Sequence, residues 1–304
     1  VIQVPDFIRH SIGFRFLHSE QSILNKLKIF TNLPTIAYSY RELNTSKQFL
    51  TFTKREERMG KLLLKRMGVS SWFVCFHSRD PAYLSKTSKQ DFSYHDYRDS
   101  DILTYLDAAN FIASKGGFAL RMGHIVNKRL PQQKNRKIVD YATKYRSDFG
   151  DMYLLSRCKF FICSTSGPVV ISNIAHVPLA QVNVLPLTDP PMRKGDLFIP
   201  KKIWDTKRKR FLAFRELVKV ESSPGQTQAK YKKAGLRVVD NTPKEILDLV
   251  TEMNQRLDGT WKSRKGDEEL HKKFKSIFGK RAPCFGFKSR IGTKFLRENK
   301  DLLA

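Results

Sequence analysis

The segment from residue 160 to 168 constrains the fold more than any other part of the chain. It begins with an apolar run, residues 160–163, and continues into a Ser-Thr-Ser-Gly-Pro loop at 164–168. A second apolar run, residues 169–175, follows directly and predicts a helix. Short continuous apolar runs are typical of strands buried on both faces of a parallel sheet. The segment therefore predicts a strand–loop–helix unit of an α/β fold.

The loop of this unit also suggests a ligand. A strand that ends in hydroxyl side chains and a glycine before a helix gathers backbone N–H groups and the positive helix dipole at one point. A phosphate can bind there. Ordinary strand–loop–helix turns of α/β domains share this pattern. A turn that binds no ligand therefore stays open as the structural alternative.

Strand-like and helix-like segments alternate along the rest of the chain. A capping box at Thr53 and Glu56 predicts a helix that ends near Gly68. The other expected helices are 101–114, 151–158 and 244–257, and the other expected strands are 72–76, 118–122, 138–141, 179–183 and 237–240. This alternation predicts a Rossmann-like parallel sheet with crossover helices.

Three regions follow from this pattern. Residues 53–260 form the expected Rossmann-like domain, residues 1–52 precede it, and residues 261–304 are expected to be a basic helical tail. The chain has a net charge of +27, and roughly half of that excess follows Met192. A charge of this size favours an anionic partner, which could be nucleic acid, an acidic membrane surface or a phosphorylated substrate. A solvated basic surface without a partner is the alternative.

Several classes of protein lack support in the sequence. No run of eighteen apolar residues could span a membrane, and no signal peptide is visible at the start. The four cysteines lack C-x-x-C spacing and are expected to be reduced core residues of a cytoplasmic protein. No G-x-G-x-x-G fingerprint follows a strand, no Walker A motif is present, and no histidine pair has metal-ligand spacing. We therefore expect neither a bound cofactor nor a metal.

Polar residues follow the expected strands at the points where each strand ends. Ligands of open parallel sheets bind beyond these carboxyl ends. Arginine forks bind phosphate oxygens in pairs, so this set suits a pyrophosphate, although arginines at strand ends also form internal salt bridges. The residues at the strand ends are His77, Arg79, Arg121, Gly123, Ser164, Thr165, Ser166, Gly167 and Asn183.

Arg98 is a further ligand candidate. It precedes Ser100 and Asp101, which suit the N-cap of the helix expected at 101–114. A cation at a helix start is unfavourable, so capping does not explain Arg98. His77 and His124 are candidate acid–base residues because imidazole titrates near neutrality, with a structural role as the alternative.

An ordered series of short motifs runs through the chain from about residue 50 to 300. It comprises Cys75-Phe76-His77-Ser78-Arg79, Tyr97-Arg98-Asp99-Ser100-Asp101, Arg121-Met122-Gly123, Asp151, residues 160–168, Asn183 with Pro186, Leu197-Phe198-Ile199-Pro200-Lys201, Phe214-Arg215-Glu216 and Glu252-Met253. In this order the motifs resemble a group of glycosyltransferases from bacterial surface-polysaccharide gene clusters. The elements at 77–79 and 164–167 are also similar to the donor-binding motifs of fucosyltransferases.

The resemblance implies a fold, an activity and roles for particular residues. It implies a GT-B fold in which this Rossmann-like half binds a nucleotide diphosphate sugar and transfers the sugar, without a metal, to a polysaccharide or lipid-linked glycan acceptor. Arg79 would neutralise the departing diphosphate, with His77 as a second catalytic candidate. The diphosphate-binding residues would be Arg79, Arg98, Arg121, Ser164, Thr165, Ser166 and Gly167, and the nucleotide- and ribose-binding residues Gly123, Asn183 and Glu216.

Two departures from the family limit what carries over. Asp99 stands where we expect an asparagine, which leaves the polar contact at this position open. A GT-B enzyme also has an N-terminal Rossmann domain, and residues 1–52 are too few to form one. We expect these residues to be the remnant of a truncated or reduced domain with its linker.

Three readings of the chain remain. The favoured one is a glycosyltransferase, or its donor-binding part, held peripherally at an anionic inner membrane by its basic tail. The second is a non-catalytic nucleic-acid-binding protein, supported by charge and by phenylalanines among the lysines of the tail. The third is a catalytically inactive relative that still binds nucleotide.

Overall fold

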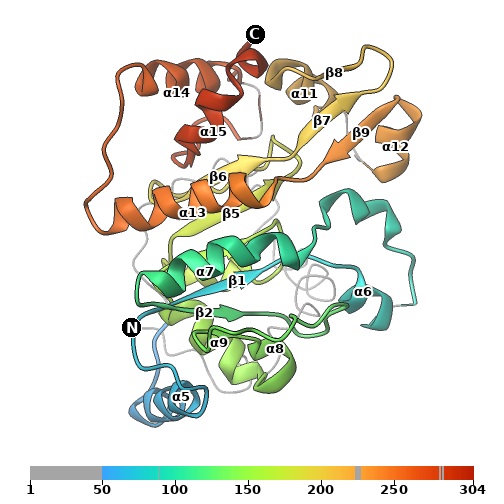
Figure 1. Ribbon diagram of the computed structural model, residues 1–304. Helices are drawn as coiled ribbons and strands as arrows, with labels where there is room; N and C mark the ends of the chain where they lie inside the picture. Colours follow the sequence, from blue (N-terminus) through green and yellow to red (C-terminus); the bar gives the residue numbers. More distant parts are fainter. Residues whose placement is uncertain (1–49, 88, 223–226, 281, 283) are drawn as a thin grey trace, which may run out of the picture.

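A seven-stranded parallel sheet forms the centre of the protein (Figure 1). The computed structural model describes residues 50–304 except 88, 223–226, 281 and 283, so most of the expected 1–52 region lies outside the described residues. In sheet order the strands are β3 (Ile138–Val139), β2 (Phe118–Arg121), β1 (Phe73–His77), β4 (Phe161–Cys163), β5 (Leu179–Val184), β6 (Leu197–Pro200) and β10 (Arg290–Ile291). The α/β class and the Rossmann-like parallel sheet predicted from the sequence are confirmed.

The strand order has a reversal at its centre. The chain runs outward from β1 through β2 to β3 and then returns to the other side of β1 for β4, β5 and β6. The connection that leaves β1 therefore crosses one face of the sheet and the connection that leaves β4 crosses the other, so the strand order has a switch point between them. In doubly wound sheets this switch point is where ligands bind.

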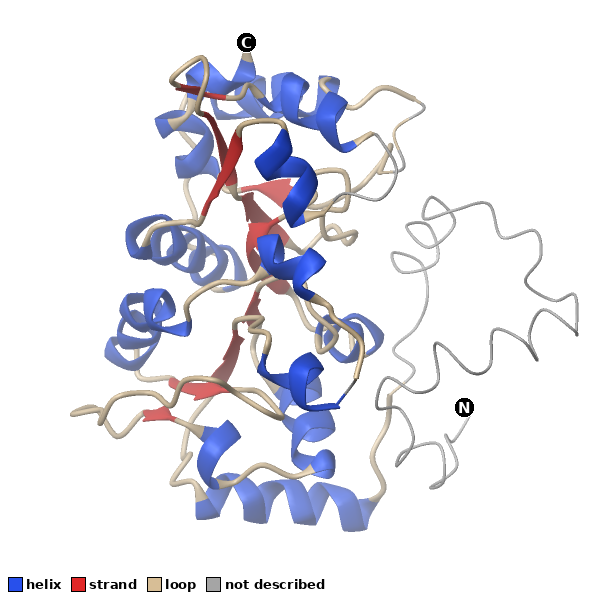
Figure 2. Cartoon of the chain, turned by 90° about the vertical axis from the view of Figure 1, so that its right-hand side faces the viewer, coloured by secondary structure: helices blue, strands red, loops and turns tan. Residues whose placement is uncertain are grey.

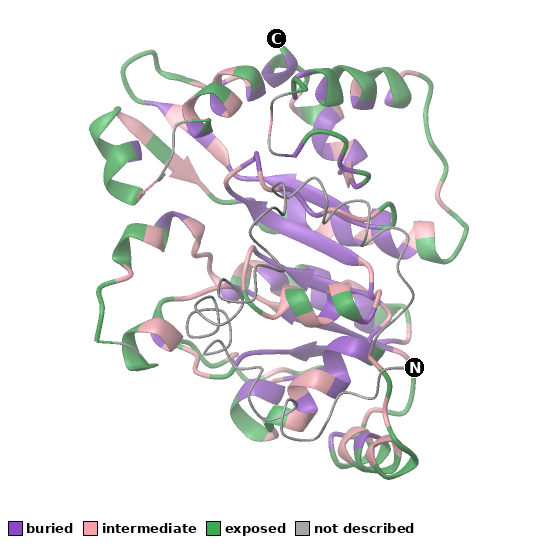
Figure 3. Ribbon diagram, turned by 180° about the vertical axis from the view of Figure 1, so that it is seen from behind, coloured by how far each residue is buried: buried purple, intermediate pink, exposed green. Residues whose placement is uncertain are grey.

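Helices cover both faces of the sheet (Figure 2). On one face α7 (Leu106–Ser114) and α13 (Pro243–Leu257) lie against each other and against side chains such as Val74 and Phe76 of β1. On the other face α9 (Asp148–Arg157) and α10 (Val169–Ile174) pack against the opposite side of the same strands. Because both faces are covered, most strand residues are apolar, and Figure 3 shows the strands almost entirely buried.

Helix caps fix the entry to two of the long helices. Thr53 and Glu56 form the expected capping box of α5 (Lys54–Arg66), and Thr242 and Glu245 form one for α13. The helix expected at 101–114 is divided, because Asp101 caps the 3₁₀ turn η2 (Ile102–Tyr105) and α7 begins only after it. Further helical segments are α6 (Ala82–Thr87), η1 (Ser93–Arg98), α8 (Tyr141–Lys144), α15 (Thr293–Glu298) and η3 (Lys300–Leu303).

A small antiparallel sheet extends from the end of β6. It consists of β8 (Arg210–Phe211), β7 (Lys202–Asp205) and β9 (Leu236–Val239), with α11 (Phe214–Glu221) and α12 (Gln228–Lys233) beside it. The strand expected at 237–240 is present as β9, but it belongs to this small sheet. Its expected place in the central parallel sheet is therefore wrong. The reason is that β6 continues almost directly into β7, which offers β9 an antiparallel partner outside the central sheet.

Residues 261–304 belong to the domain and are not an appended tail. They contribute α14 (Asp267–Ser276) and α15, and also β10, which pairs with β6 at the edge of the central sheet. Phe274, Phe278 and Phe287 are buried in the same cluster as α7 and α13, whereas Phe285 is exposed. The sequence suggested a tail because lysines surround these phenylalanines, but burial of the aromatic rings outweighs solvation of the flexible lysine stems.

Two further expectations can be compared with the described residues. All four cysteines are free and buried, as expected for reduced core residues. Among the described helices none combines the length and the apolar character needed to cross a bilayer.

The integration of the C-terminal segment is testable with a matched pair of phenylalanines. Phe274→Ala is expected to lower the free energy of unfolding by about 3–5 kcal/mol, because it removes a ring that is 1% exposed. Phe285→Ala, at 47% exposure, should change it by less than about 0.5 kcal/mol. Urea denaturation of both variants measures this, and equal small effects would show that 261–304 is an independent tail.

Candidate functional site

Two hydrogen bonds join the loops that follow β1 and β4. The Arg79 backbone N–H donates to Ser164 Oγ at 2.8 Å, and the Ser164 N–H donates to the His77 carbonyl at 3.3 Å. Ser164 is fully buried, so its side chain serves this junction and does not face solvent. The junction sets the spacing between the two loops at the switch point.

Arg79 is held along one edge of its guanidinium group. Its Nη1 donates to the His95 carbonyl at 3.1 Å and to Asp99 Oδ1. Within the described part of the chain, no hydrogen bond involves its Nε or Nη2. Arginine binds phosphate oxygens through two parallel donors, so the remaining edge of Arg79 has the chemistry for such a contact.

The loop after β4 presents further donors next to Arg79. Arg98 Nη2 donates to the Thr165 carbonyl at 3.2 Å, and Gln181 of β5 donates to Thr165 Oγ1 at 3.0 Å. Ser166 and Thr165 are half-buried and Gly167 is exposed, so this part of the loop is open to a ligand. The buried Arg98 Nε has no partner among the described residues.

His77 lies between the same two loops. Its Nδ1 is 3.3 Å from Ser166 Oγ, which in turn donates to the Ser164 carbonyl at 3.1 Å. Burial, with the charges of Arg121 and Arg79, lowers the pKa of His77 to about 4. The ring is therefore neutral at physiological pH and can exchange a hydrogen bond with Ser166.

Segment 93–101, called the strap below, crosses the carboxyl ends of the strands (Figure 1, teal loop to the right of α7). It contacts the loop after β1 through the Ser100 N–H, which donates to the Arg79 carbonyl at 3.1 Å. It contacts the junction of β6 and β7 through Lys201, whose Nζ donates to the Asp99 carbonyl at 2.6 Å. The strap therefore connects both sides of the switch point.

Lys201 and His95 have no counterpart among the site residues predicted from the sequence. The side chain of Lys201 is 2% exposed and forms an ion pair with Asp240 at 2.7 Å. A buried lysine directly after an apolar strand was the available signal, because lysines are rarely buried unless they are paired. The contact of His95 with Arg79 uses a backbone carbonyl, which leaves no signature in the sequence.

The structure buries Arg121 beneath the site. Its side chain is 2% exposed, its Nη1 lies 3.2 Å from Asp140 Oδ1, and its Nη2 donates to the Lys128 carbonyl at 2.8 Å. It acts on the site through its charge on His77. Gly123 follows at φ +150°, and a Cβ there would meet Val126 at 2.5 Å and His77 at 3.9 Å, so the backbone approaches His77 closely.

Asn183 and Glu216 both form hydrogen bonds within the fold. Asn183 is 1% exposed, and its backbone and side chain exchange hydrogen bonds of 2.6 and 2.7 Å with those of Asn241. Glu216 caps α11 through the Ala213 N–H and binds Arg210 at 2.6 Å, and these hydrogen bonds lower its pKa to about 2. No printed contact joins Glu216 to the switch-point loops, and its ribose-binding role stays a prediction.

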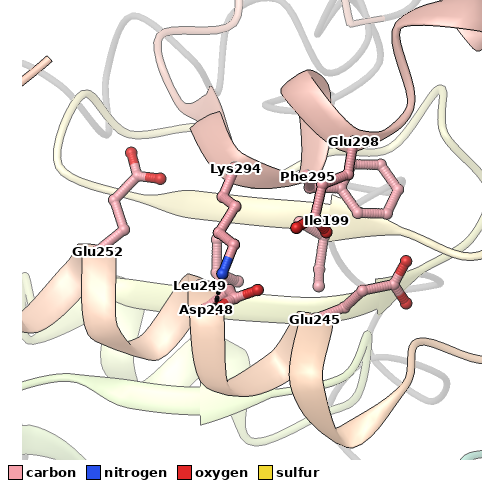
Figure 4. A pocket seen from close by; sticks show the side chains of 9 residues that line it. Ile199, Glu245, Asp248, Leu249, Glu252, Lys294, Phe295 and Glu298 are labelled. Carbon is pink, nitrogen blue, oxygen red and sulfur yellow. Dashed lines mark hydrogen bonds and ion pairs between the residues drawn. The ribbon is translucent and has the colours of Figure 1, made fainter. Parts of the chain in front are cut away.

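A pocket lined by four carboxylates lies elsewhere in the fold. Figure 4 shows this pocket between α13 and α15, and none of its lining residues comes from the loops after β1 or β4. Lysines and an arginine already engage these carboxylates: Lys294 and Lys244 bind Asp248, Lys244 also binds Glu298, Lys202 binds Glu245, and Arg256 binds Glu252. This pocket is a seam of ion pairs between helices.

Two carboxyl groups beyond β5 have raised pKa values. Burial raises the pKa of Asp189, against the opposing charge of Arg98. Burial also raises the pKa of Glu221, at the end of α11, to about 8, although Glu221 accepts a hydrogen bond from the Thr188 N–H at 3.2 Å. Glu221 is therefore largely protonated at neutral pH in the folded protein.

The described residues contain no group of three or more His, Cys, Asp or Glu side chains arranged to hold a metal ion. Comparison of the chain with family models, with curated proteins and with solved structures gives no match. The site must therefore be interpreted from its own geometry.

Glu221 makes stability depend on pH in a defined direction. Its folded pKa of about 8 lies above the ordinary value of 4.5, so the folded state binds more protons between these values, and stability falls as pH rises through them. Relative to Glu221→Gln, the wild type should lose up to about 1.4 kcal/mol per pH unit from pH 5 to 8. Urea denaturation across this range measures the difference. Glu269→Gln, an exposed change on α14, should run parallel to the wild type, and a parallel Glu221→Gln curve would refute the assignment.

Proposed function

We propose that the protein is a glycosyltransferase, or the donor-binding part of one, that holds the diphosphate of a nucleotide sugar at the switch point. The observation that carries this proposal is the Arg79 guanidinium group, fixed along one edge by Asp99 and the His95 carbonyl with its second edge unpaired among the described residues. The topology supports it, because ligands of doubly wound sheets bind at the switch point of the strand order. The resemblance of residues 77–79 and 164–167 to donor-binding motifs is the basis for proposing a nucleotide diphosphate sugar as the ligand.

The proposed mechanism is electrostatic and metal-independent. The acceptor oxygen forms a bond to the anomeric carbon of the sugar, and the bond from that carbon to the diphosphate oxygen breaks. The electron pair stays on the diphosphate, and the acceptor proton passes to a base. Arg79, with Ser166, Thr165 and the Gly167 backbone, would stabilise the charge that develops on the departing diphosphate.

The other residues predicted to bind the diphosphate lie at different positions relative to this charge. Arg98 reaches the Thr165 carbonyl and could approach the same anion. Arg121 and Ser164 are buried and engaged, so we propose that they support the site from beneath without touching the ligand. The neutral His77 would orient Ser166.

The assignment to a GT-B fold is also a proposal. A GT-B enzyme binds its donor in one Rossmann-like domain and its acceptor in another, and the described residues provide one parallel sheet of the required kind. We propose a glycan or lipid-linked acceptor bound opposite the switch point. The second reading, nucleic-acid binding, loses its aromatic support because three of the four phenylalanines concerned are buried.

The donor site is tested by replacing its central cation. Arg79→Ala should weaken the binding of a nucleotide diphosphate sugar at least about tenfold, because a hydrogen bond to a charged group contributes about 1.5–3 kcal/mol. Calorimetry with a panel of UDP-, GDP-, dTDP- and CDP-linked sugars identifies the donor and measures the loss. Arg55→Ala removes the same charge from exposed α5 and should leave affinity unchanged. Failure of every donor to bind the wild type would refute the proposal.

We further propose that the basic C-terminal segment attracts the protein to an anionic membrane surface. Lysines of 261–304 remain exposed although the phenylalanines between them are buried, among them Lys272, Lys273, Lys280 and Lys288. Basic residues near an acidic lipid surface contribute about 1 kcal/mol each.

Liposome co-sedimentation tests this attraction. The wild type should bind vesicles increasingly as the fraction of anionic lipid rises, and reversing Lys272, Lys273, Lys280 and Lys288 to Glu should largely abolish binding at physiological salt. The same number of reversals at Lys54, Arg55, Lys61 and Lys65 of α5 provides the matched control. Binding that ignores the lipid charge would contradict the proposal.

A further inference from the structure

We propose that Asp99 is the positioning residue and the counter-ion of Arg79, so that the switch-point site binds an anion more tightly when Asp99 is protonated. The proposal rests on the proposed function in taking the natural anion to be a diphosphate. It goes further in two ways. It gives Asp99 a role in the site, and it predicts how the affinity of the site for an anion depends on pH.

The contacts of Arg79 show why Asp99 both helps and opposes an anion. Asp99 Oδ1 and the His95 carbonyl share Nη1, which fixes the plane of the guanidinium group. The side chains of Arg79 and Asp99 are only 11% and 19% exposed, so solvent screens the pair weakly. Orientation therefore requires only a hydrogen-bond acceptor at position 99, whereas the negative charge of the carboxylate reduces the attraction of Arg79 for a ligand.

Asp99 is not free to move away when an anion arrives. Its carbonyl accepts a hydrogen bond of 2.6 Å from Lys201, and Lys201 is buried and paired with Asp240. The N–H of the same peptide group, that of Ser100, donates to the Arg79 carbonyl. Because the peptide group between residues 99 and 100 is hydrogen-bonded at both its C=O and its N–H, the backbone holds Asp99 beside Arg79.

The charges around Asp99 come from three elements. Arg79 and Asp80 follow β1, Lys201 lies between β6 and β7, and Asp96 belongs to η1. Burial is the largest influence and raises the pKa of Asp99 to about 6, against the two cations that lower it. Asp99 is therefore ionised well above pH 6 and protonated well below it. Anion affinity should rise as pH falls through about 6, and a bound anion should in turn favour protonation of Asp99.

Two histidines near Arg79 also have lowered pKa values. The pKa of His77 is lowered to about 4, and that of His95 is also lowered by burial and by Arg98 and Arg79. Their protonation would also strengthen anion binding, but it would do so in the absence of the Asp99 carboxyl group. The variant Asp99→Asn separates the two causes, because the amide oxygen can still accept from Arg79 while the charge is lost.

The test measures the binding of sulfate by calorimetry at constant ionic strength from pH 5 to 8, where sulfate keeps its full charge. The wild type should bind sulfate about tenfold more tightly at pH 5 than at pH 8, the size of effect expected for one close charge pair. Asp99→Asn should bind at pH 8 as tightly as the wild type does at pH 5, with a flat profile between them. Glu269→Gln removes one charge from an exposed position of α14 and should keep the wild-type profile.

Three results would overturn the inference. A flat wild-type profile would mean that protonation of Asp99 does not change the affinity of the site for sulfate. A rise that persists in Asp99→Asn would assign the effect to the histidines. Weaker binding by Asp99→Asn at every pH would make Asp99 a structural anchor only. Because sulfate carries no nucleotide or sugar, these outcomes are independent of the donor panel, whose failure would refute the proposed function and leave the role of Asp99 standing.

Discussion

The hydrogen-bonded junction between the loops after β1 and β4 is the interaction on which the candidate site depends. Ser164 accepts from the Arg79 N–H and donates to the His77 carbonyl, so one buried residue fixes both loops. The strap then attaches to this junction through Arg79 and to β6 through Lys201. A parallel sheet makes this arrangement possible, because it brings the carboxyl ends of β1, β4 and β6 to one edge.

The site sets three cations against three carboxyl groups. Arg79, Arg98 and Lys201 lie in or beside the strap, and Asp99, Asp189 and Asp240 oppose them. Burial raises the pKa of both Asp99 and Asp189, so proximity to arginine does not by itself keep a carboxyl group ionised here.

Some elements of the fold could be predicted from local sequence signals, and others could not. The capping boxes of α5 and α13 and the apolar cores of β1, β4 and β5 were predictable, because caps and continuous apolar runs are local signals. The antiparallel placement of β9 and the entry of β10 into the central sheet were not. These pairings depend on which strand edge remains available after β6 has formed, and no local pattern encodes that.

The sequence by itself determined the class of the fold, the strand-end loops and the presence there of Arg79, Arg98 and the hydroxyl residues of the loop at 164–167. Only the tertiary structure decided which of these are buried and which partners they have. It buried Ser164 and Arg121, engaged Glu216 in capping α11, and placed Asp99 against Arg79. The reason is that a residue type defines what a side chain can bind, whereas its partners depend on residues far along the chain, as Lys201 does for Asp99.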